Sequence, residues 1–121
     1  MPTLTVATDK PEYSIGEIAR VTCVADFTDP AGGWPPDIWA LVTVEIKDDR
    51  GQYGSPQTYP DFPLHDRDPE SEQVVSGWTA VPIQSGRWGS FRVSALFYEP
   101  ERQEVGASSV EFVVRQLSEQ E

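Results

Sequence analysis

The single histidine of the chain, His65, opens a short acidic segment that offers the clearest material for chemistry. Nucleophilic catalysis of the Ser-His-Asp type needs a histidine held by a carboxylate and placed beside an activated serine. Asp66 and Asp68 supply carboxylates nearby, but the sequence has no Gly-x-Ser-x-Gly turn to present a serine. We therefore expect His65 to be an exposed loop residue and the protein not to be an enzyme.

The same segment has oxygen ligands suited to a cation. Its acidic residues recur at every second position: Asp66, Asp68, Glu70 and Glu72. Calcium takes roughly six to eight oxygen ligands, often from alternate positions of one loop. However, Arg67 offsets part of the charge, Pro69 stiffens the backbone, and the glycine of an EF-hand loop is missing. The sequence predicts a solvated acidic loop, with calcium binding as the alternative, and it predicts no cofactor.

Composition narrows the class of partner. The chain has 121 residues, enough for one domain, and a net charge of −11 from twenty acidic and nine basic residues. Nucleic acids and anionic membranes attract basic proteins, so both are disfavoured. The negative charge favours solubility, cation binding or a basic partner, and we expect it to form a solvated acidic surface. No stretch approaches the length of about 18 apolar residues that a membrane span needs.

Other features bear on location and organisation. No signal peptide is visible after Met1, because the first residues are neither basic nor part of an apolar run. We expect either a protein of a virion or similar particle, or a domain excised from an extracellular protein. Cys23 is the only cysteine, so an intrachain disulfide is excluded, and its alternating strand predicts a small buried hydrophobe. We expect residues 1–115 to form the domain and 116–121 a flexible tail.

Alternating apolar residues between turn residues predict about seven strands and almost no helix. We expect strands at 3–8, 17–27, 38–48, 73–83, 88–99 and 103–115, and a short edge strand at 52–57. The segment 52–72 is otherwise expected to be irregular because four prolines interrupt it, at 56, 60, 63 and 69. The predicted inward residues are Ala19, Val21, Cys23, Ala25, Phe27, Ile38, Ala40, Val42, Val44, Ile46, Phe91, Val93, Ala95, Phe97, Val110, Phe112 and Val114. This pattern predicts an all-β, antiparallel β-sandwich.

Two segments resemble macroglobulin-type domains, the immunoglobulin-like modules of the α2-macroglobulin and complement family, of which bacterial cell-surface proteins carry similar versions. The first is TDKPEY at residues 8–13, then Gly16-Glu17 and an alternating strand. The second comprises Gly86, Trp88, FRVSA at 91–95 and SVEFVV at 109–114. Ile15 departs from the family, which usually has proline there, and so does the proline-rich insert at 52–72. The resemblance implies an immunoglobulin-like sandwich that acts as a spacer or scaffold; the family's Cys-Gly-Glu-Gln thioester motif is absent from this sequence.

Strand parity then selects a group of outward aromatic and aliphatic residues. Trp39 and Leu41 alternate with the inward residues of one strand, and Leu96 and Tyr98 with those of another. The third and sixth strands are antiparallel neighbours in an immunoglobulin sandwich, so these four side chains should meet on the outer face of one sheet. Large apolar patches mark interaction surfaces, and Trp and Tyr often anchor them. The alternatives are that a long loop covers the patch, or that a bulge turns Trp39 into the core.

The sequence therefore predicts a non-catalytic structural or assembly module that binds a protein partner, or further copies of itself, through an outer aromatic sheet face. Such a module would be a spacer in a surface protein or a decoration subunit of a virion or similar particle. The alternative is a carbohydrate-binding module that stacks sugars on exposed tryptophans. The candidate binding residues are Trp34, Trp39, Leu41, Trp88, Leu96 and Tyr98.

Overall fold

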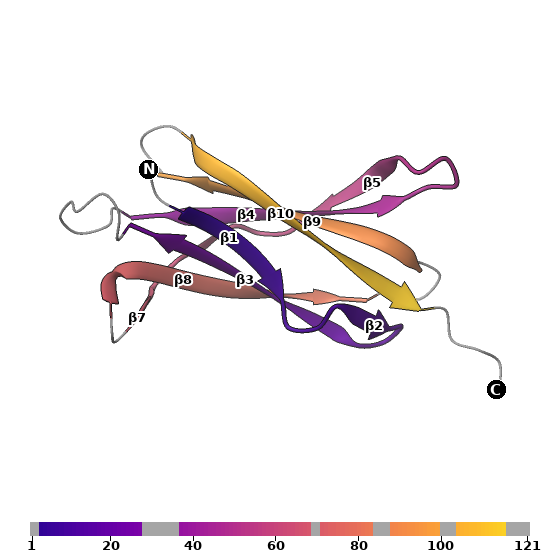
Figure 1. The fold of residues 1–121 in the computed structure, drawn as a ribbon, viewed down its shortest axis with the longest axis horizontal. Helices are drawn as coiled ribbons and strands as arrows, with labels where there is room; N and C mark the ends of the chain where they lie inside the picture. The colour runs from indigo at the N-terminus through magenta and orange to yellow at the C-terminus, as the bar shows by residue number, and fades with distance from the viewer. Residues whose placement is uncertain (1–2, 28–36, 69–70, 84–87, 100–103, 116–121) are drawn as a thin grey trace.

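A computed structural model describes residues 3–27, 37–68, 71–83, 88–99 and 104–115 of the chain (Figure 1). These residues form strands and no helix, so nothing helical in them is long and apolar enough to span a membrane. Trp34 and the tail at 116–121 lie outside the described residues. The strands are β1 (Thr3–Thr8), β2 (Glu12–Ser14), β3 (Ile18–Asp26), β4 (Trp39–Lys47), β5 (Tyr53–Thr58), β6 (Phe62–Pro63), β7 (Asp66–Asp68), β8 (Ser71–Pro82), β9 (Gly89–Tyr98) and β10 (Glu104–Arg115).

The strands form two packed sheets, which confirms the predicted all-β sandwich. One sheet has the order β1-β3-β8-β7, and the other has the order β2-β10-β9-β4-β5 with β6 beside β4. Their neighbours run antiparallel except β2 and β10, which are parallel. This order is that of an immunoglobulin-like sandwich, with an extra strand on the outer side of β4 as in variable-type domains.

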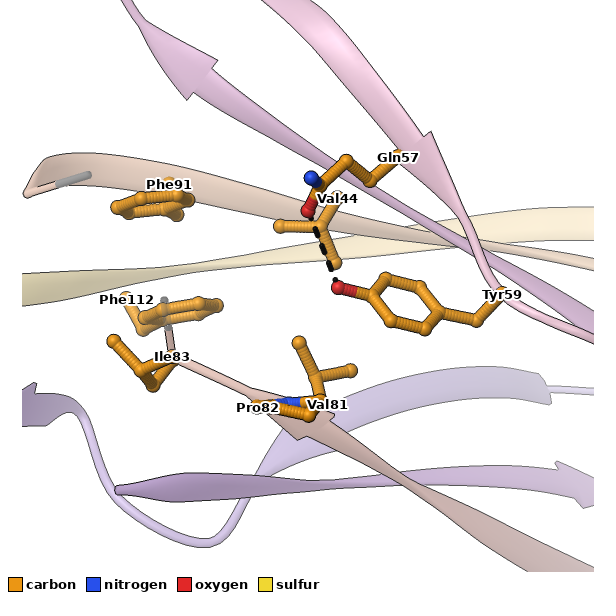
Figure 2. A pocket seen from close by; sticks show the side chains of 8 residues that line it. All are labelled: Val44, Gln57, Tyr59, Val81, Pro82, Ile83, Phe91 and Phe112. Carbon is orange, nitrogen blue, oxygen red and sulfur yellow. Dashed lines mark hydrogen bonds between the residues drawn. The ribbon is translucent and has the colours of Figure 1, made fainter. Parts of the chain in front are cut away.

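The core lies between the sheets, on the face that the alternation predicts. All the predicted inward residues are buried except three, Phe27, Ile46 and Val110, which are partly buried and pack against the core. Phe91 and Phe112 stack with ring centroids 5.3 Å apart and planes 3° apart (Figure 2). The edge of the Tyr13 ring meets Phe112 at the same centroid distance of 5.3 Å. Aromatic contacts of this kind add to the stabilisation that burial itself supplies.

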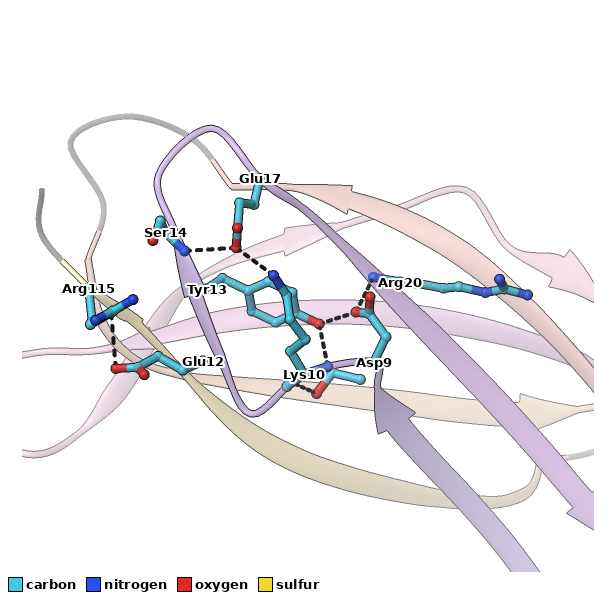
Figure 3. A network of polar contacts seen from close by, with 9 residues as sticks. Asp9, Lys10, Glu12, Tyr13, Ser14, Glu17, Arg20 and Arg115 are labelled. Carbon is cyan, nitrogen blue, oxygen red and sulfur yellow. Dashed lines mark hydrogen bonds and ion pairs between the residues drawn. The ribbon is translucent and has the colours of Figure 1, made fainter.

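Between β1 and β2 the chain crosses from one sheet to the other, and a polar network holds the crossing (Figure 3). The Tyr13 hydroxyl donates a hydrogen bond to the Asp9 carboxylate and accepts one from the backbone N–H of Lys10 at 3.1 Å. The backbone N–H of Arg20 also donates to Asp9, at 3.0 Å. The two bonds to Asp9 favour its ionised form and so lower its pKa below the ordinary 3.8. The bond from Tyr13 has the larger effect, and the bond from Arg20 the next. The network therefore ties the crossing to β3.

The turn after β2 depends on Gly16, whose φ of +98° is in the region that favours glycine. Glu17 closes this turn by accepting a hydrogen bond from the Ser14 N–H and an ion pair from the Lys10 ammonium, both at 3.0 Å. Both contacts favour the ionised carboxylate and lower the pKa of Glu17, the bond from Ser14 more than the one from Lys10. The sequence TDKPEYSIGE thus forms the end of β1, a crossing that contains Pro11, the short strand β2, which was not predicted, and a glycine turn into β3.

The segment at 52–72 is more regular than predicted. The edge strand expected at 52–57 is present as β5, but β6 and β7 follow it, and residues 71–72 already belong to β8. Leu64 explains this, because its buried side chain fills the space between the sheets and its N–H donates to the Ile38 carbonyl at 2.9 Å. The expectation of one irregular loop is therefore wrong: the chain pairs first with β4 and then with β8.

Candidate docking face

The predicted group of four residues is assembled on the outer face of the six-stranded sheet. In the antiparallel register of β4 and β9, Trp39 is opposite Tyr98 and Leu41 is opposite Leu96. Side chains of directly opposed residues lie on the same face of a sheet and touch. No bulge turns Trp39 into the core, since its neighbours Ile38 and Ala40 are the buried residues. We call these four residues the aromatic patch.

The aromatic patch is partly covered. All four of its side chains are partly buried rather than fully exposed. Pro63 of β6 pairs alongside Trp39, and the Tyr98 hydroxyl donates a hydrogen bond to the Asp61 carboxylate. Because β4 lies between β9 and β6, the Tyr98 side chain must reach across the outer face of β4 to make this bond. The segment before β6 thus borders the patch, as one alternative anticipated, but leaves part of each side chain accessible.

Acidic residues surround this end of the sheet. Glu104 is opposite Tyr98 in the pairing of β9 and β10, and Asp37 precedes the start of β4 by two residues. Both are exposed, as is Asp61. The aromatic patch therefore has an acidic rim, which adds local negative potential to the overall charge of −11.

The rest of the outer face is mostly polar, apart from Val113 of β10, which is 43% exposed at the opposite end of the sheet. Next to the aromatic patch lies a row of hydroxyl residues that runs from Thr58 through Thr43 and Ser94 to Ser109. Beyond this row, a network links four strands of the sheet. Arg92 forms an ion pair with Glu45 at 2.7 Å, and its guanidinium lies 4.4 Å from the ring centroid of Tyr53. The Tyr53 hydroxyl in turn donates a hydrogen bond to the Glu111 carboxylate at 2.7 Å. The cluster of apolar residues thus lies at one end of this face, and Val113 is a separate exposed apolar residue at the other end.

Trp88 does not join the aromatic patch. It is 46% exposed but precedes β9, whereas Leu96 and Tyr98 are at the other end of that strand. Ten residues of extended strand separate Trp88 from Tyr98, a distance of about 33 Å. Trp88 is therefore remote from the patch, and its role as a binding residue stays a prediction. Trp34 lies outside the described residues, so its place relative to the patch stays a prediction.

The sequence reasoning missed Trp78, which lies on the outer face of the other sheet. It is 48% exposed, and the Arg20 guanidinium lies 4.3 Å from its ring centroid. Thr22 of β3 is its cross-strand partner. The sequence could have indicated this position. The buried residues of β8, which include Val75 and Val81, have odd numbers, so the even-numbered Trp78 must face outward.

A hollow opens between the sheets beside β5 and the end of β8 (Figure 2). Its volume is about 270 Å³ including its open mouth, and the stacked rings of Phe91 and Phe112 border it. At the mouth the Tyr59 hydroxyl donates to the Gln57 side-chain oxygen at 3.3 Å. The lining carries no carboxylate, imidazole or thiol: Val44, Gln57, Tyr59, Val81, Pro82, Ile83, Phe91 and Phe112. Its chemistry is apolar contact.

The acidic segment is in the β7–β8 hairpin. His65 and Asp66 are exposed, and Asp68 is the last residue of β7. Glu70 lies outside the described residues, and Glu72 lies in β8. Within the part of the chain whose side chains are described, no group of three or more His, Cys, Asp or Glu residues is placed to hold a metal ion. Calcium binding by this segment stays a prediction.

Comparison with known proteins identifies the fold. No protein-family model matches the sequence, and no curated protein matches it. Among solved structures, the alkylpurine DNA glycosylase AlkC of Pseudomonas fluorescens, bound to DNA containing an abasic-site analog, is similar with 17% identity and a TM-score of 0.54. The CARDB domain of the PF1109 protein of Pyrococcus furiosus, in complex with di-metal ions, is similar with 13% identity and a TM-score of 0.53. The sporulation control protein Spo0M of Bacillus subtilis is similar with 15% identity and a TM-score of 0.51.

These similarities cover almost all of this chain but different shares of the other proteins. The matched part is 94% of this chain for the glycosylase and the CARDB domain, and 93% for Spo0M. It is 30% of the glycosylase chain, 89% of the CARDB chain and 49% of Spo0M. Likeness at such low identity supports the sandwich fold alone. None of the three names a macroglobulin-type domain, so that resemblance stays a prediction.

Proposed function

We propose that this protein is a non-catalytic module that docks to a protein partner through the aromatic patch. The observation that carries the proposal is the cross-strand group of Trp39, Leu41, Leu96 and Tyr98, which places two aromatic and two branched aliphatic side chains together on an outward sheet face. Outward positions of a sheet that has a solvated face are normally polar, as most of the rest of this face is. An apolar cluster there gains free energy when a partner removes it from water.

The charge of the rim indicates the chemistry of the partner. Asp37, Asp61 and Glu104 are exposed around the patch, and the chain as a whole is strongly acidic. The partner surface that fits is an apolar centre surrounded by Lys and Arg side chains. Complementary rims of this kind mainly accelerate association and exclude wrong partners, while the buried apolar centre supplies affinity. The module would then serve as a spacer in a surface protein or as a decoration subunit of a virion or similar particle.

The experiment compares three forms of the protein as bait in extracts of its source: wild type, Leu96→Asp and Trp88→Asp. Trp88 is an exposed apolar residue remote from the patch, so its variant controls for a general loss of surface hydrophobicity. Any protein retained by the wild type and Trp88→Asp but lost with Leu96→Asp is then purified and titrated by calorimetry. We expect direct binding that weakens with salt. Equal retention by all three baits, or no direct binding of the purified protein, would reject the proposal.

A second function has a specific observation in its favour. The hydroxyl row of Thr43, Thr58 and Ser94 lies beside Leu41 and Leu96, and Trp39 and Tyr98 are the next outward pair along the strands. Sugar-binding sites combine aromatic rings with hydrogen-bonding groups. A carbohydrate-binding module would lose glycan binding on an array with Trp39→Ala, and Leu96→Asp would matter less. Glycan binding by a stable monomer with that pattern would replace the protein-docking proposal.

The similar structures add nothing to either function. The glycosylase structure contains DNA and the CARDB structure contains metal ions. Phosphate binding needs a basic surface, and this chain carries a net charge of −11. We therefore do not propose DNA as a ligand here.

A further inference from the structure

The edges of the two sheets differ in how they are protected against pairing with another chain. β5 contains Pro56, has a positive φ of 51° at Ser55 and shifts register against β4. β2 and β7 are three residues long, and β7 has the charged sequence DRD. Short length, proline, charge and bulges are the features that keep natural sheet edges from adding strands. β1 has none of them: its sequence TLTVAT is six residues long, uncharged and free of proline and glycine.

The backbone groups that β1 presents at this edge follow from the register. The N–H of Asp9, just past the strand, donates to the carbonyl of Arg20 on β3 at 3.1 Å. Hydrogen-bonded positions alternate along an antiparallel pair, so Ala7 and the odd-numbered residues before it also bond to β3. The backbone N–H and C=O groups of Leu4, Val6 and Thr8 therefore point away from β3, and no backbone bond to them is found within the described part of the chain.

We propose that β1 pairs with β1 of a second copy of this chain, forming an antiparallel dimer with its two-fold axis at Val6. Val6 then lies opposite its own counterpart, and Leu4 lies opposite Thr8 of the second copy. At all three positions the backbone N–H and C=O groups point away from β3, toward the second copy. The pairing is therefore self-complementary and forms about six hydrogen bonds. The two four-stranded sheets become one continuous sheet.

The side chains along the edge permit this pairing. Thr5 and Ala7 are exposed on the outer face, and in the dimer they lie opposite Ala7 and Thr5 of the second copy. These residues are small and uncharged, so no like charges oppose each other in these pairs. β10 of the other sheet runs beside β1 (Figure 1). Leu4 lies against Gly106 of β10, where a Cβ would meet the Leu4 side chain at 2.6 Å, so the absence of a side chain at Gly106 limits obstruction. The net charge of −11 on each copy opposes association, so the dimer should be weak and strengthen with salt.

The symmetry has a consequence for docking, which rests on the proposed function. A two-fold axis between antiparallel strands is perpendicular to their sheet, so both six-stranded sheets lie on the same side of the continuous sheet. The two aromatic patches then face in the same general direction. A dimer of this kind could engage two sites on one repetitive surface, and its avidity would exceed the affinity of either patch.

The test uses sedimentation equilibrium of the purified chain at concentrations up to about 1 mM, where weak pairing is populated. We expect the apparent mass to rise from 13.5 kDa toward twice that value. The variant T5K/A7K places Lys opposite Lys twice and should weaken the dimer by about tenfold or more. The matched variant T5K/A7E places Lys opposite Glu and should restore it. Thermal unfolding of each variant separates a lost dimer from a lost fold.

Hydrogen exchange provides a second readout. The amides of Leu4, Val6 and Thr8 should become protected as the concentration rises, whereas the amides at 107, 109 and 111, on the free edge of β10, should not change. A protein that stays monomeric at about 1 mM, or a dimer that T5K/A7K leaves intact, would overturn the proposal. A dimer that is lost with Leu96→Asp would show self-association through the aromatic patch instead. None of these measurements needs the docking partner, so they are independent of the proposed function.

Discussion

The burial of Cys23 allows a quantitative test of the strand parity on which the outward faces depend. Cys23 is in β3, the strand between β1 and β8, and its side chain is completely buried between the sheets. Burial raises the pKa of the thiol from 9.0 to about 12 because the thiolate would lose its hydration. Only the thiolate reacts with disulfide reagents, so burial suppresses labelling through ionisation as well as through access.

The size of the effect follows from these two barriers. The rise in pKa lowers the thiolate fraction near neutral pH by about a thousandfold. The reagent can otherwise reach Cys23 only when β3 opens, and for a domain of ordinary stability the open fraction is below about one in a thousand. We therefore expect labelling of the native protein to be at least about a thousandfold slower than labelling in denaturant.

The assay follows the absorbance of a chromogenic disulfide reagent at pH 8 with and without denaturant. The matched control moves the thiol by one residue, in the double variant Cys23→Ala/Thr22→Cys. Thr22 faces outward and is partly exposed, so its cysteine should label within about a hundredfold of the denatured rate. If native Cys23 labels within tenfold of the denatured rate, the parity of β3 is wrong. A slip by one residue would turn every side chain of that strand to the opposite face.

Three further predictions concern stability. Phe97→Ala should lower the free energy of unfolding by about 3–5 kcal/mol in urea titrations, because Phe97 is fully buried and its loss leaves a cavity; a loss under 1 kcal/mol would contradict its place in the core. Gly77→Ala should cost about 1–3 kcal/mol, since a Cβ would lie 2.8 Å from a backbone oxygen, whereas Gly54→Ala meets nothing within 4 Å and should leave stability nearly unchanged. Tyr13→Phe removes the bond that most lowers the pKa of Asp9; its destabilisation should be present above pH 3.8 and shrink as pH falls below that value, and a pH-independent effect would assign it to packing instead.

The aromatic patch was predictable because two simple regularities combine. Period-two alternation in 38–46 and 91–97 is unbroken, so it determines which residues face outward. The immunoglobulin topology then makes these two segments antiparallel neighbours, and the start of one must meet the end of the other. Trp39 and Tyr98 are thereby brought together from 59 residues apart, as the register of β4 and β9 shows. Long strands with strong alternation carry this information within themselves.

The surroundings of the patch were not predictable in the same way. β6 and β7 have two and three residues, too few to show any period. Their pairing is imposed by tertiary contacts, chiefly the insertion of Leu64 between the sheets. The bond between Asp61 and Tyr98 follows from that insertion. A local pattern cannot foresee a segment whose strand character depends on distant partners.

Exposure alone would have selected a different surface from the aromatic patch. Trp78 is more exposed than any residue of the patch, at 48%. One face of its ring, however, is covered by Arg20 at 4.3 Å, a cation–π contact that stabilises the free protein and would have to be replaced on binding. Its cross-strand partner is the polar Thr22. In the aromatic patch, by contrast, Leu41 and Leu96 extend the apolar surface without a competing charge. Contiguity of apolar area, rather than the exposure of one ring, therefore favours the six-stranded sheet as the docking side.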